Sequence, residues 1–558
     1  MRNIFNSIPL SVPKRNRFNL SHLVKTTCEM GQLVPVLCQD VLPNDRFKLS
    51  CNHLIRFAPF LAPIMSEVDV YFHFFFVPNR LIWTGWEDFI TGAHNGRKLS
   101  EDQIPVPPRY VFPDRGSFMQ FLQNGRLSNG SLADYLGFQT WSKSFNPPSN
   151  SSYSLDALPF RAYNKIFDDY YRDENLTGES GVDDFIDQSG DIIWNAQSQT
   201  EPLLMMDLHN RSWKKDYFTS ALPFAQKGDD VVIPGTTGFD KGFIPLSQDS
   251  SKVSSSFQST VSSSQLSPVF YQENSTSGNV SFGSFIQNGL SVFPSSKFLR
   301  INSDDLNSSL SEGTIRELRR AFAAQRFLER RAVGGSRYIE QNLAMFGARS
   351  SDGRLQRAQF LGGSKSPVVV SQVLQTSEST QASPLGQPAG TAVSAGGRYI
   401  FDRNFEEYGW IIGLMSVVPK ADYMQGVPRK FLRRDVYDYY FPQFAHIGEQ
   451  PIMNQELYYS LSNSGADGGN EGTFGYTPRY AEYRFNSNRV SGDFKDSLKF
   501  WTLGRDFQSI PSLNSQFVTC NPSNRIYAVE DTDFNHLWCE LSLSIKALRP
   551  IPKYAESL

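Results

Sequence analysis

Residues 68–83, VDVYFHFFFVPNRLIW, read as one strand with apolar side chains on both of its faces. Val68, Phe72 and Phe76 fall on one face, whereas Tyr71 and Phe75 fall on the other. A strand with one solvated face alternates apolar and polar residues, so this pattern predicts a strand covered on both sides. The run is too short and too interrupted for a membrane helix, which needs about 18 apolar residues. Either a large β-sandwich or a neighbouring subunit is expected to supply the cover.

The composition of the chain favours sheet over helix. Of its 558 residues, 13% are aromatic, including 44 Phe and 23 Tyr, and aromatic residues are enriched in strands. The 40 Gly and 32 Pro predict many short elements joined by long loops. Further strands are expected within residues 31–57, 366–377, 410–419 and 538–552.

Helical spacing appears in a few places. Residues 117–123 and 132–138 predict short helices, and residues 158–176 predict a longer one. The longer segment carries an aromatic stripe that we interpret as core packing and not as a ligand site: Phe160, Tyr163, Ile166, Phe167, Tyr170 and Tyr171. The clearest helix begins near Thr314, which has capping-box spacing to Glu317, and stops at Gly334. Its arginine-rich surface is interpreted first as a solvated face.

Charge and cysteine usage narrow the class of protein. The net charge is −2, so contact with nucleic acid would have to come from local basic patches or from a separate basic partner. The five cysteines show no metal-binding spacing and are expected to be free thiols in a reducing compartment. The start of the chain does not resemble a signal peptide, because prolines break a very short apolar stretch.

Two segments differ from the rest of the chain. Residues 1–30 are basic and broken by prolines, which predicts an extended N-terminal arm, with a solvated tail as the alternative. Residues 235–312 differ from their surroundings: the stretch 247–284 within them is Ser-rich and nearly uncharged, yet it keeps scattered aromatic residues that a disordered linker would lack. We interpret this second segment as a small β-rich insertion that projects from the main body.

The sequence shows no catalytic or cofactor-binding pattern. Its seven histidines lack metal-ligand spacing, and neither a nucleophile elbow nor a phosphate-binding loop is present. His73 lies within the aromatic strand and is interpreted as a core residue. The chain is therefore expected to be a structural protein with no cofactor and no metal, and not an enzyme.

Several motifs, in order, resemble the major capsid protein of the Microviridae, and their wording is closest to the gokushovirus branch. They are RFNLSHLVKTTCEMGQLVPV (17–36), FFFVPNRLIWTGWEDFITG (74–92), DYFTSALPFAQKGDDVVIP (216–234), the stretch from ELRRAF to FLGG (317–363) and RPIP (549–552). The resemblance covers most of the chain except about residues 90–210 and 235–312.

The resemblance implies an all-β-dominated fold: a single eight-stranded jelly-roll sandwich with long inter-strand insertions that contain some helices. It implies that the chain assembles with itself into a T=1 icosahedral shell around a circular single-stranded DNA genome, aided by a small basic DNA-binding viral peptide. It also implies a threefold protrusion that meets a host cell-surface receptor, no membrane insertion, and assembly of the virion capsid in the cytoplasm of a bacterial host.

On this interpretation the chain divides into four parts. Residues 1–30 are the arm, residues 31–234 hold the first part of the jelly roll with a loop insertion at about 90–210, residues 235–312 are the protrusion, and residues 313–558 hold the helix and the remaining strands. The alternative from another class is a β-sandwich carbohydrate-binding or glycosidase-like protein, which would need an exposed aromatic platform beside paired carboxylates.

Two sets of candidate site residues follow. The candidate nucleic-acid contacts are Lys14, Arg15, Arg17, Arg429, Lys430, Arg433 and Arg434. The last four lie beside Tyr437, Tyr439 and Tyr440; the alternative is that these tyrosines are core and that the arginines pair with Asp435 and Asp438. The candidate attachment residues of the protrusion are Phe257, Phe270, Tyr271, Phe282 and Phe285, with a trimer-stabilising plug as the alternative role.

Overall fold

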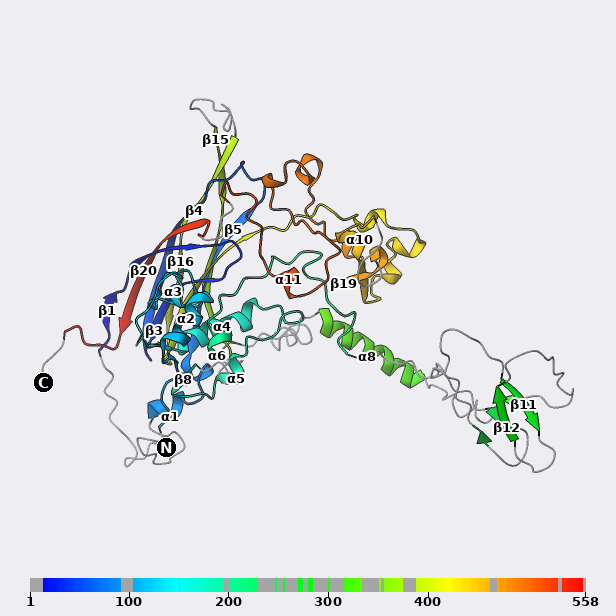
Figure 1. Cartoon of the computed structure of the whole chain (residues 1–558), viewed down its shortest axis with the longest axis horizontal. Helices are drawn as coiled ribbons and strands as arrows, with labels where there is room; N and C mark the ends of the chain where they lie inside the picture. Colours follow the sequence, from blue (N-terminus) through cyan, green and yellow to red (C-terminus); the bar gives the residue numbers. More distant parts are fainter. Residues whose placement is uncertain are drawn as a thin grey trace. The chain divides into compact units, whose positions relative to one another are not determined.

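The computed structural model divides the chain into two compact units, residues 1–225 with 330–558 and residues 226–329 (Figure 1). It describes residues 14–91, 104–149, 151–194, 201–228, 315–333, 351–352, 356–374, 388–461, 469–529 and 534–554, together with five short strands between residues 246 and 301. The two units are described separately below.

The first unit is built on two antiparallel sheets. The six-stranded sheet runs β1-β20-β4-β16-β15, with β2 also paired to β20; its strands are β1 (Asn16–Asn19), β2 (His22–Cys28), β4 (Arg46–Phe57), β15 (Val369–Leu374), β16 (Pro388–Asn404) and β20 (Leu537–Arg549). The four-stranded sheet runs β14-β5-β17-β3; its strands are β3 (Val34–Val41), β5 (Val68–Pro78), β14 (Gln359–Pro367) and β17 (Gly409–Pro419). Side chains of both sheets form one hydrophobic core, so the sheets pack face to face.

The strand that opens the sequence analysis is covered on both faces, as predicted. β5 lies between β14 and β17. Val70, Phe72 and Phe74 point into the core between the sheets. On the other face, Phe75 and Val77 belong to a second core, which helices, strands and loops of residues 82–208 build over the four-stranded sheet. The cover therefore comes from the same chain.

This covering layer, the insertion predicted at about residues 90–210, contains the predicted helices and also a small sheet that was not predicted. Its three-stranded sheet has the order β7-β6-β8; the strands are β6 (Arg109–Phe112), β7 (Tyr153–Asp156) and β8 (Asp191–Ile193). Its short helices are α1 (Trp86–Thr91), α2 (Arg115–Gln123), α3 (Leu132–Leu136), α4 (Leu158–Ile166), α5 (Val182–Phe185) and α6 (Glu201–Met205). Asp114 caps α2 by accepting a hydrogen bond from the Ser117 N–H at 2.8 Å. The predicted aromatic stripe runs through α4 and the π-helical turn Phe167–Tyr171, and Phe160 and Tyr163 are fully buried, which confirms core packing.

A third core joins residues 213–221 to the segment between β17 and β20. Trp213 and Phe218 pack there with Tyr423, Phe474 and Phe517. The elements of this region are short: β18 (Glu449–Met453), β19 (Thr473–Pro478), α10 (Asn454–Leu457), α11 (Ser515–Val518) and 3₁₀ helices at Arg429–Phe431, Val436–Asp438, Pro442–Phe444, Gly469–Glu471, Ala481–Tyr483, Gly492–Lys495 and Lys499–Trp501; another 3₁₀ helix, Asn79–Leu81, follows β5. Their positions depend on packing between distant segments, because few of them have local regularity of their own.

The second unit contains small strands and one long helix. β9 (Leu246–Ser247) pairs with β10 (Ser254–Ser255) and β13 (Arg300–Ile301), and β11 (Val269–Glu273) forms a hairpin with β12 (Val280–Ser284). α8 (Ile315–Val333) begins in this unit, and the predicted arginine-rich helix is thereby confirmed. Thr314, its predicted cap, lies outside the described residues.

The described part of the predicted N-terminal arm is mostly sheet. β1 and β2 both pair antiparallel with β20, with Arg17 opposite Leu548 and Cys28 opposite Leu537. All five cysteines are free thiols, as predicted, and the sulfurs of Cys28 and Cys539 lie 4.0 Å apart. No helix in the described part of the chain has the length and apolar character needed to span a membrane.

Candidate functional site

His73 and His209 are held by packing and hydrogen bonds. His73 Nδ1 and the Tyr171 hydroxyl are 2.7 Å apart, and His209 Nε2 lies 2.6 Å from Asn164 Oδ1. Burial lowers the pKa of His73 to about 4, with a further contribution from the positive charge of Arg211, and burial lowers the pKa of His209 to about 4. Both rings are therefore neutral at pH 7. The described residues contain no cluster of three or more His, Cys, Asp or Glu side chains that could hold a metal ion.

Two of the four cations predicted near residue 430 are tied to carboxylates. Arg429 Nη1 lies 3.0 Å from Glu456 Oε1 and also donates to the carbonyl oxygen of Pro451 at 2.5 Å. Arg433 Nη2 lies 3.8 Å from Glu482 Oε1, and its guanidinium also lies 4.3 Å from the centre of the Tyr483 ring. These partners are 27 and 49 positions away in the sequence, so no local pattern pointed to them.

The tyrosines of this segment are exposed, which rules out the alternative that they are core residues. Tyr437, Tyr439 and Tyr440 are 58%, 53% and 50% exposed. The Asp438 carboxylate accepts hydrogen bonds from the backbone N–H groups of Arg434 and Asp435. These two bonds lower the pKa of Asp438, so this carboxylate serves the local turn. Lys430 and Arg434 are exposed.

The N-terminal candidates lie at the start of the described chain. Lys14, Arg15 and Arg17 are exposed, and Arg17 lies on β1. Arg15 Nη1 donates to Asn44 Oδ1 at 3.3 Å, beside the turn that precedes β4. The structure therefore brings this group to one end of the six-stranded sheet and does not join it to residues 429–434 by any described contact.

The protrusion candidates lie partly on the β11–β12 hairpin. Tyr271 is opposite Phe282 in the register, and Phe270 is opposite Gly283. Phe257 and Phe285 lie outside the described residues.

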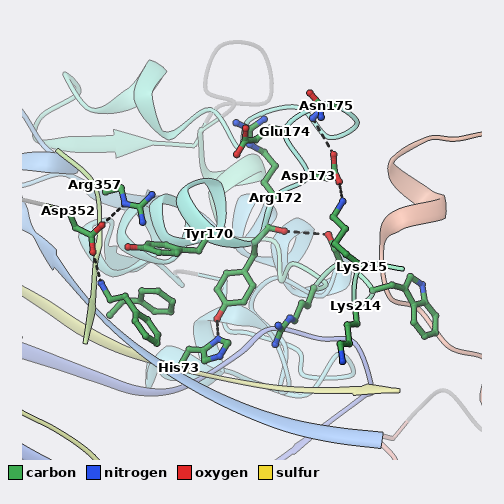
Figure 2. A pocket seen from close by; sticks show the side chains of 16 residues that line it. His73, Tyr170, Arg172, Asp173, Glu174, Asn175, Lys214, Lys215, Asp352 and Arg357 are labelled. Atoms are coloured by element: carbon green, nitrogen blue, oxygen red, sulfur yellow. Dashed lines mark hydrogen bonds and ion pairs between the residues drawn. The ribbon is translucent and has the colours of Figure 1, made fainter. Parts of the chain in front are cut away.

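The structure contains a cavity lined by polar and aromatic side chains that the sequence did not predict. It has a volume of 760 Å³ and lies between residues 170–175, which follow α4, the segment 211–215 and the start of β14. In Figure 2, the Asp352–Arg357 pair lies at one end, Lys214 and Lys215 lie at the other, and His73 lies along the floor. Its lining comes from residues 73–75, 170–175, 211–215 and 352–360, which are far apart in the sequence, so no motif could have indicated the cavity.

Most of the basic side chains around this cavity form ion pairs. Arg357 Nε lies 2.7 Å from Asp352 Oδ1, and Arg172 Nη2 lies 3.1 Å from Glu179 Oε1. Lys215 pairs with Asp173. Arg211 differs, because its guanidinium lies 4.3 Å from the centre of the Tyr71 ring and its Nη1 donates to the Ser416 hydroxyl at 3.1 Å.

Comparison with known proteins assigns the chain to a family. A family model described as "Capsid protein (F protein)" matches residues 6–558. The chain is 36% identical to a capsid protein VP1 of Chlamydia phage 1, over 100% of this chain and 97% of the relative. It is 31% identical to a capsid protein VP1 of Bdellovibrio phage phiMH2K (99% and 96%) and 28% identical to one of Spiroplasma virus 4 (97% and 94%). The chain belongs to this family of phage capsid proteins and is a component of the virion.

Proposed function

We propose that copies of this chain assemble into a T=1 icosahedral shell that encloses a circular single-stranded DNA genome. The observation that carries the assembly step is an exposed aromatic patch of Tyr437, Tyr439, Tyr440, Phe441 and Tyr483, whose residues are between 39% and 58% exposed. Soluble monomers seldom expose large apolar patches, and aromatic residues and arginine are enriched at protein–protein interfaces. A second copy of the chain is the proposed partner of this patch.

The aromatic patch is held in place by its own contacts. The Arg433 guanidinium lies 5.3 Å from the centre of the Tyr439 ring and also stacks on Tyr483. The Tyr440 N–H donates to the Tyr483 hydroxyl at 3.3 Å, and Arg479 Nη2 donates to the Tyr437 carbonyl oxygen at 2.9 Å. Because these groups are ordered before a partner arrives, association costs less conformational entropy.

The strand order supports a jelly roll as the fold of each subunit. Counted along the chain, β2, β3, β4, β5, β14, β16, β17 and β20 are eight strands. One sheet then has the order 1-8-3-6 and the other has the order 2-7-4-5. This pairing of first with last and second with second-to-last strands is that of a chain folded as a double Greek key. The long insertions then lie between strands four and five and between strands seven and eight.

The genome contacts are proposed to be local. Lys14, Arg15, Arg17, Lys430 and Arg434 are exposed and available to phosphate groups. Arg429 and Arg433 remain candidates only as supports, because carboxylates already bind them. Since the net charge is −2, a small basic peptide is proposed as a further partner that neutralises DNA.

The second compact unit is proposed to form the protrusion that meets a host receptor. Residues 226–329 are compact by themselves, and the insertion lies between β5 and β14, two strands that pair directly. A long insert between paired strands costs little loop-closure entropy. A plug that stabilises trimers remains the alternative role.

The experiment for assembly replaces two exposed members of the aromatic patch. A Tyr439→Ser/Tyr440→Ser variant is expected to remain folded, as shown by circular dichroism, and to lose shell formation in negative-stain images and light scattering. The matched control is Tyr554→Ser, a tyrosine that is 73% exposed outside the patch. Shells formed normally by the double variant would overturn the assignment of the patch. A wild-type chain that stays monomeric would overturn shell formation by this chain alone.

A further inference from the structure

We propose that the cavity shown in Figure 2 binds a nucleotide unit, with Arg211 and Lys214 contacting the phosphate and the Phe360 ring stacking on the base. The inference rests on the proposed function for the source of the nucleotide, which is the packaged genome. The binding chemistry itself does not depend on shell formation.

The first argument is unbalanced positive charge. Arg172, Arg211, Lys214, Lys215 and Arg357 line the cavity against three carboxylates. Lys215 and Arg357 pair with two of these carboxylates, Asp173 and Asp352, and Glu174 is the third. Arg172 pairs with Glu179, which lies outside the lining, whereas Arg211 and Lys214 have no carboxylate partner among the described residues. His73 is neutral at pH 7, so its ring adds no charge at the floor. The two remaining cations belong to one short segment and face one cavity.

Arg211 is built into its place. Its guanidinium stacks on Tyr71 at 4.3 Å and lies 5.6 Å from the centre of the Tyr171 ring, while one nitrogen is hydrogen bonded to Ser416. A guanidinium fixed on its flat face by aromatic rings keeps its N–H edge directed sideways, which is the edge that binds phosphate oxygens. Lys214 is exposed and supplies a mobile second charge.

The second argument is an aromatic face that the fold leaves uncovered. Phe360 is 43% exposed, although it contacts Phe75 at 5.4 Å and His73 at 5.8 Å between ring centres. By contrast, the Arg357 guanidinium lies 4.5 Å from the centre of the Tyr170 ring and covers it. Phe360 is therefore the ring able to stack on a base, because Tyr170 is already occupied.

The unpaired cation and the exposed ring lie beside a hydrogen-bonded pair of residues, His73 and Tyr171. His73 contacts the Phe360 ring and is hydrogen bonded to Tyr171, and Tyr171 lies beside Arg211. An anion alone would not need the aromatic face, and an apolar ligand would leave the cations unpaired. A nucleotide carries both a phosphate and a flat ring, and 760 Å³ lies in the range of small-molecule sites.

The test measures binding of a fluorescein-labelled short oligothymidylate to the purified full chain by fluorescence anisotropy. Lys214→Glu is expected to weaken binding about tenfold and to reduce the salt dependence by about one phosphate contact. Phe360→Ala is expected to weaken binding by at least about fivefold through lost stacking. Lys143→Glu, the same charge change at an exposed lysine outside the cavity, is the matched control and is expected to change binding less than about twofold.

Several outcomes would overturn the assignment. Wild-type affinity in both cavity variants removes the site, and weakening by Lys214→Glu alone leaves an anion site without base stacking. Competition with thymidine monophosphate identifies the source of the bound nucleotide. If the monophosphate displaces the labelled oligothymidylate at the same concentrations as unlabelled oligothymidylate does, the site binds free nucleotides. If only the unlabelled oligothymidylate displaces it, the site binds the genome. Both cavity variants are expected to form shells. Failure of the wild-type chain to do so would overturn the proposed function without altering the binding result.

Discussion

Glu29 and His536 join the end of β2 to the start of β20. Glu29 Oε1 lies 2.6 Å from His536 Nδ1 and also accepts the His536 backbone N–H at 2.8 Å. Glu29 follows the last residue of β2, and His536 precedes the first residue of β20, so the pair fixes the register at one end of these two strands. The ring is fully buried, stacks on Tyr527 at 4.2 Å and has its Nε2 2.9 Å from the Val529 carbonyl oxygen.

Removing the charge of Glu29 is expected to destabilise the sandwich. Glu29→Gln weakens two hydrogen bonds to His536 and is expected to lower the free energy of unfolding by about 1–3 kcal/mol. Urea unfolding of the unassembled chain measures the loss. The control is Glu67→Gln. The Glu67 side chain pairs with Lys420 and is 74% exposed, so loss of this ion pair is expected to cost less than about 1 kcal/mol. Equal losses in the two variants would contradict the role of Glu29.

The buried pair of Arg161 and Glu201 is expected to be costly to break. Both side chains are fully buried, and Glu201 Oε1 also accepts a hydrogen bond from the Tyr110 hydroxyl at 2.9 Å. Glu201→Gln leaves a buried guanidinium without its counter-charge and is expected to cost about 3–5 kcal/mol in urea unfolding. Glu179→Gln, at a pair whose carboxylate is 67% exposed, is the control. A small loss for Glu201→Gln would mean that water reaches Arg161.

Acid is expected to destabilise the chain through His209. Its ring stacks on Phe167 at 4.0 Å, and its folded-state pKa of about 4 lies below the usual value for unfolded histidine, about 6.5. The unfolded chain therefore binds the proton first, and stability is lost as the pH falls from about 6.5 towards 4, by about 2 kcal/mol at pH 5. His209→Gln is expected to flatten this part of the pH–stability curve, whereas His22→Gln, at an exposed histidine, is expected to leave it unchanged.

The three N-terminal cations are expected to affect genome content but not folding. Replacing Lys14, Arg15 and Arg17 together by glutamine removes exposed charges and only one described side-chain contact, that of Arg15 with Asn44. Particles of this variant are expected to form in normal yield with a lower ratio of absorbance at 260 nm to that at 280 nm. Normal DNA content would show that the genome is held elsewhere.

Replacing residues 245–290 by a short Gly/Ser linker is expected to leave shell formation intact and to abolish attachment to the host. The replaced segment lies within the second compact unit, so the two sheets of the first unit keep all of their strands. Negative-stain images and adsorption to host cells measure the two effects. Shells that fail to form would favour the trimer plug, and normal adsorption would remove the receptor role.

The sequence pattern was sufficient to predict the elements that have a continuous apolar character. Phe72 and Phe75 predicted a strand covered on both faces, and Phe160 and Tyr163 predicted a buried helix, because in each case a regular repeat places apolar groups on defined faces. For β2, with the sequence HLVKTTC, the basic composition of residues 1–30 predicts only part of an extended arm. Its side chains are mostly exposed, so the pairing with β20 that positions it leaves little trace in composition.

The candidate sites were less predictable because their contacts cross long stretches of chain. The sequence predicts Arg429 and Arg433 either as DNA contacts or as partners of nearby aspartates, whereas the carboxylates that bind them, Glu456 and Glu482, come from other segments. Arg211 and Phe360 line the same cavity beside His73, and their spacing in the sequence does not predict that they are neighbours. Charge pairing and cavities of this kind arise from tertiary packing, which composition and periodicity do not encode.

The position of β20 has a consequence for synthesis. This last strand lies between β4 and the first two strands, so the six-stranded sheet cannot close until about residue 549 has left the ribosome. An unfinished chain would keep the edge of β4 open and the sandwich core incomplete, which is the condition in which nascent chains aggregate or are degraded. The fold is thus expected to delay a subunit's competence to join its neighbours until β20 has been synthesised, and to exclude chains truncated before β20 from the particle.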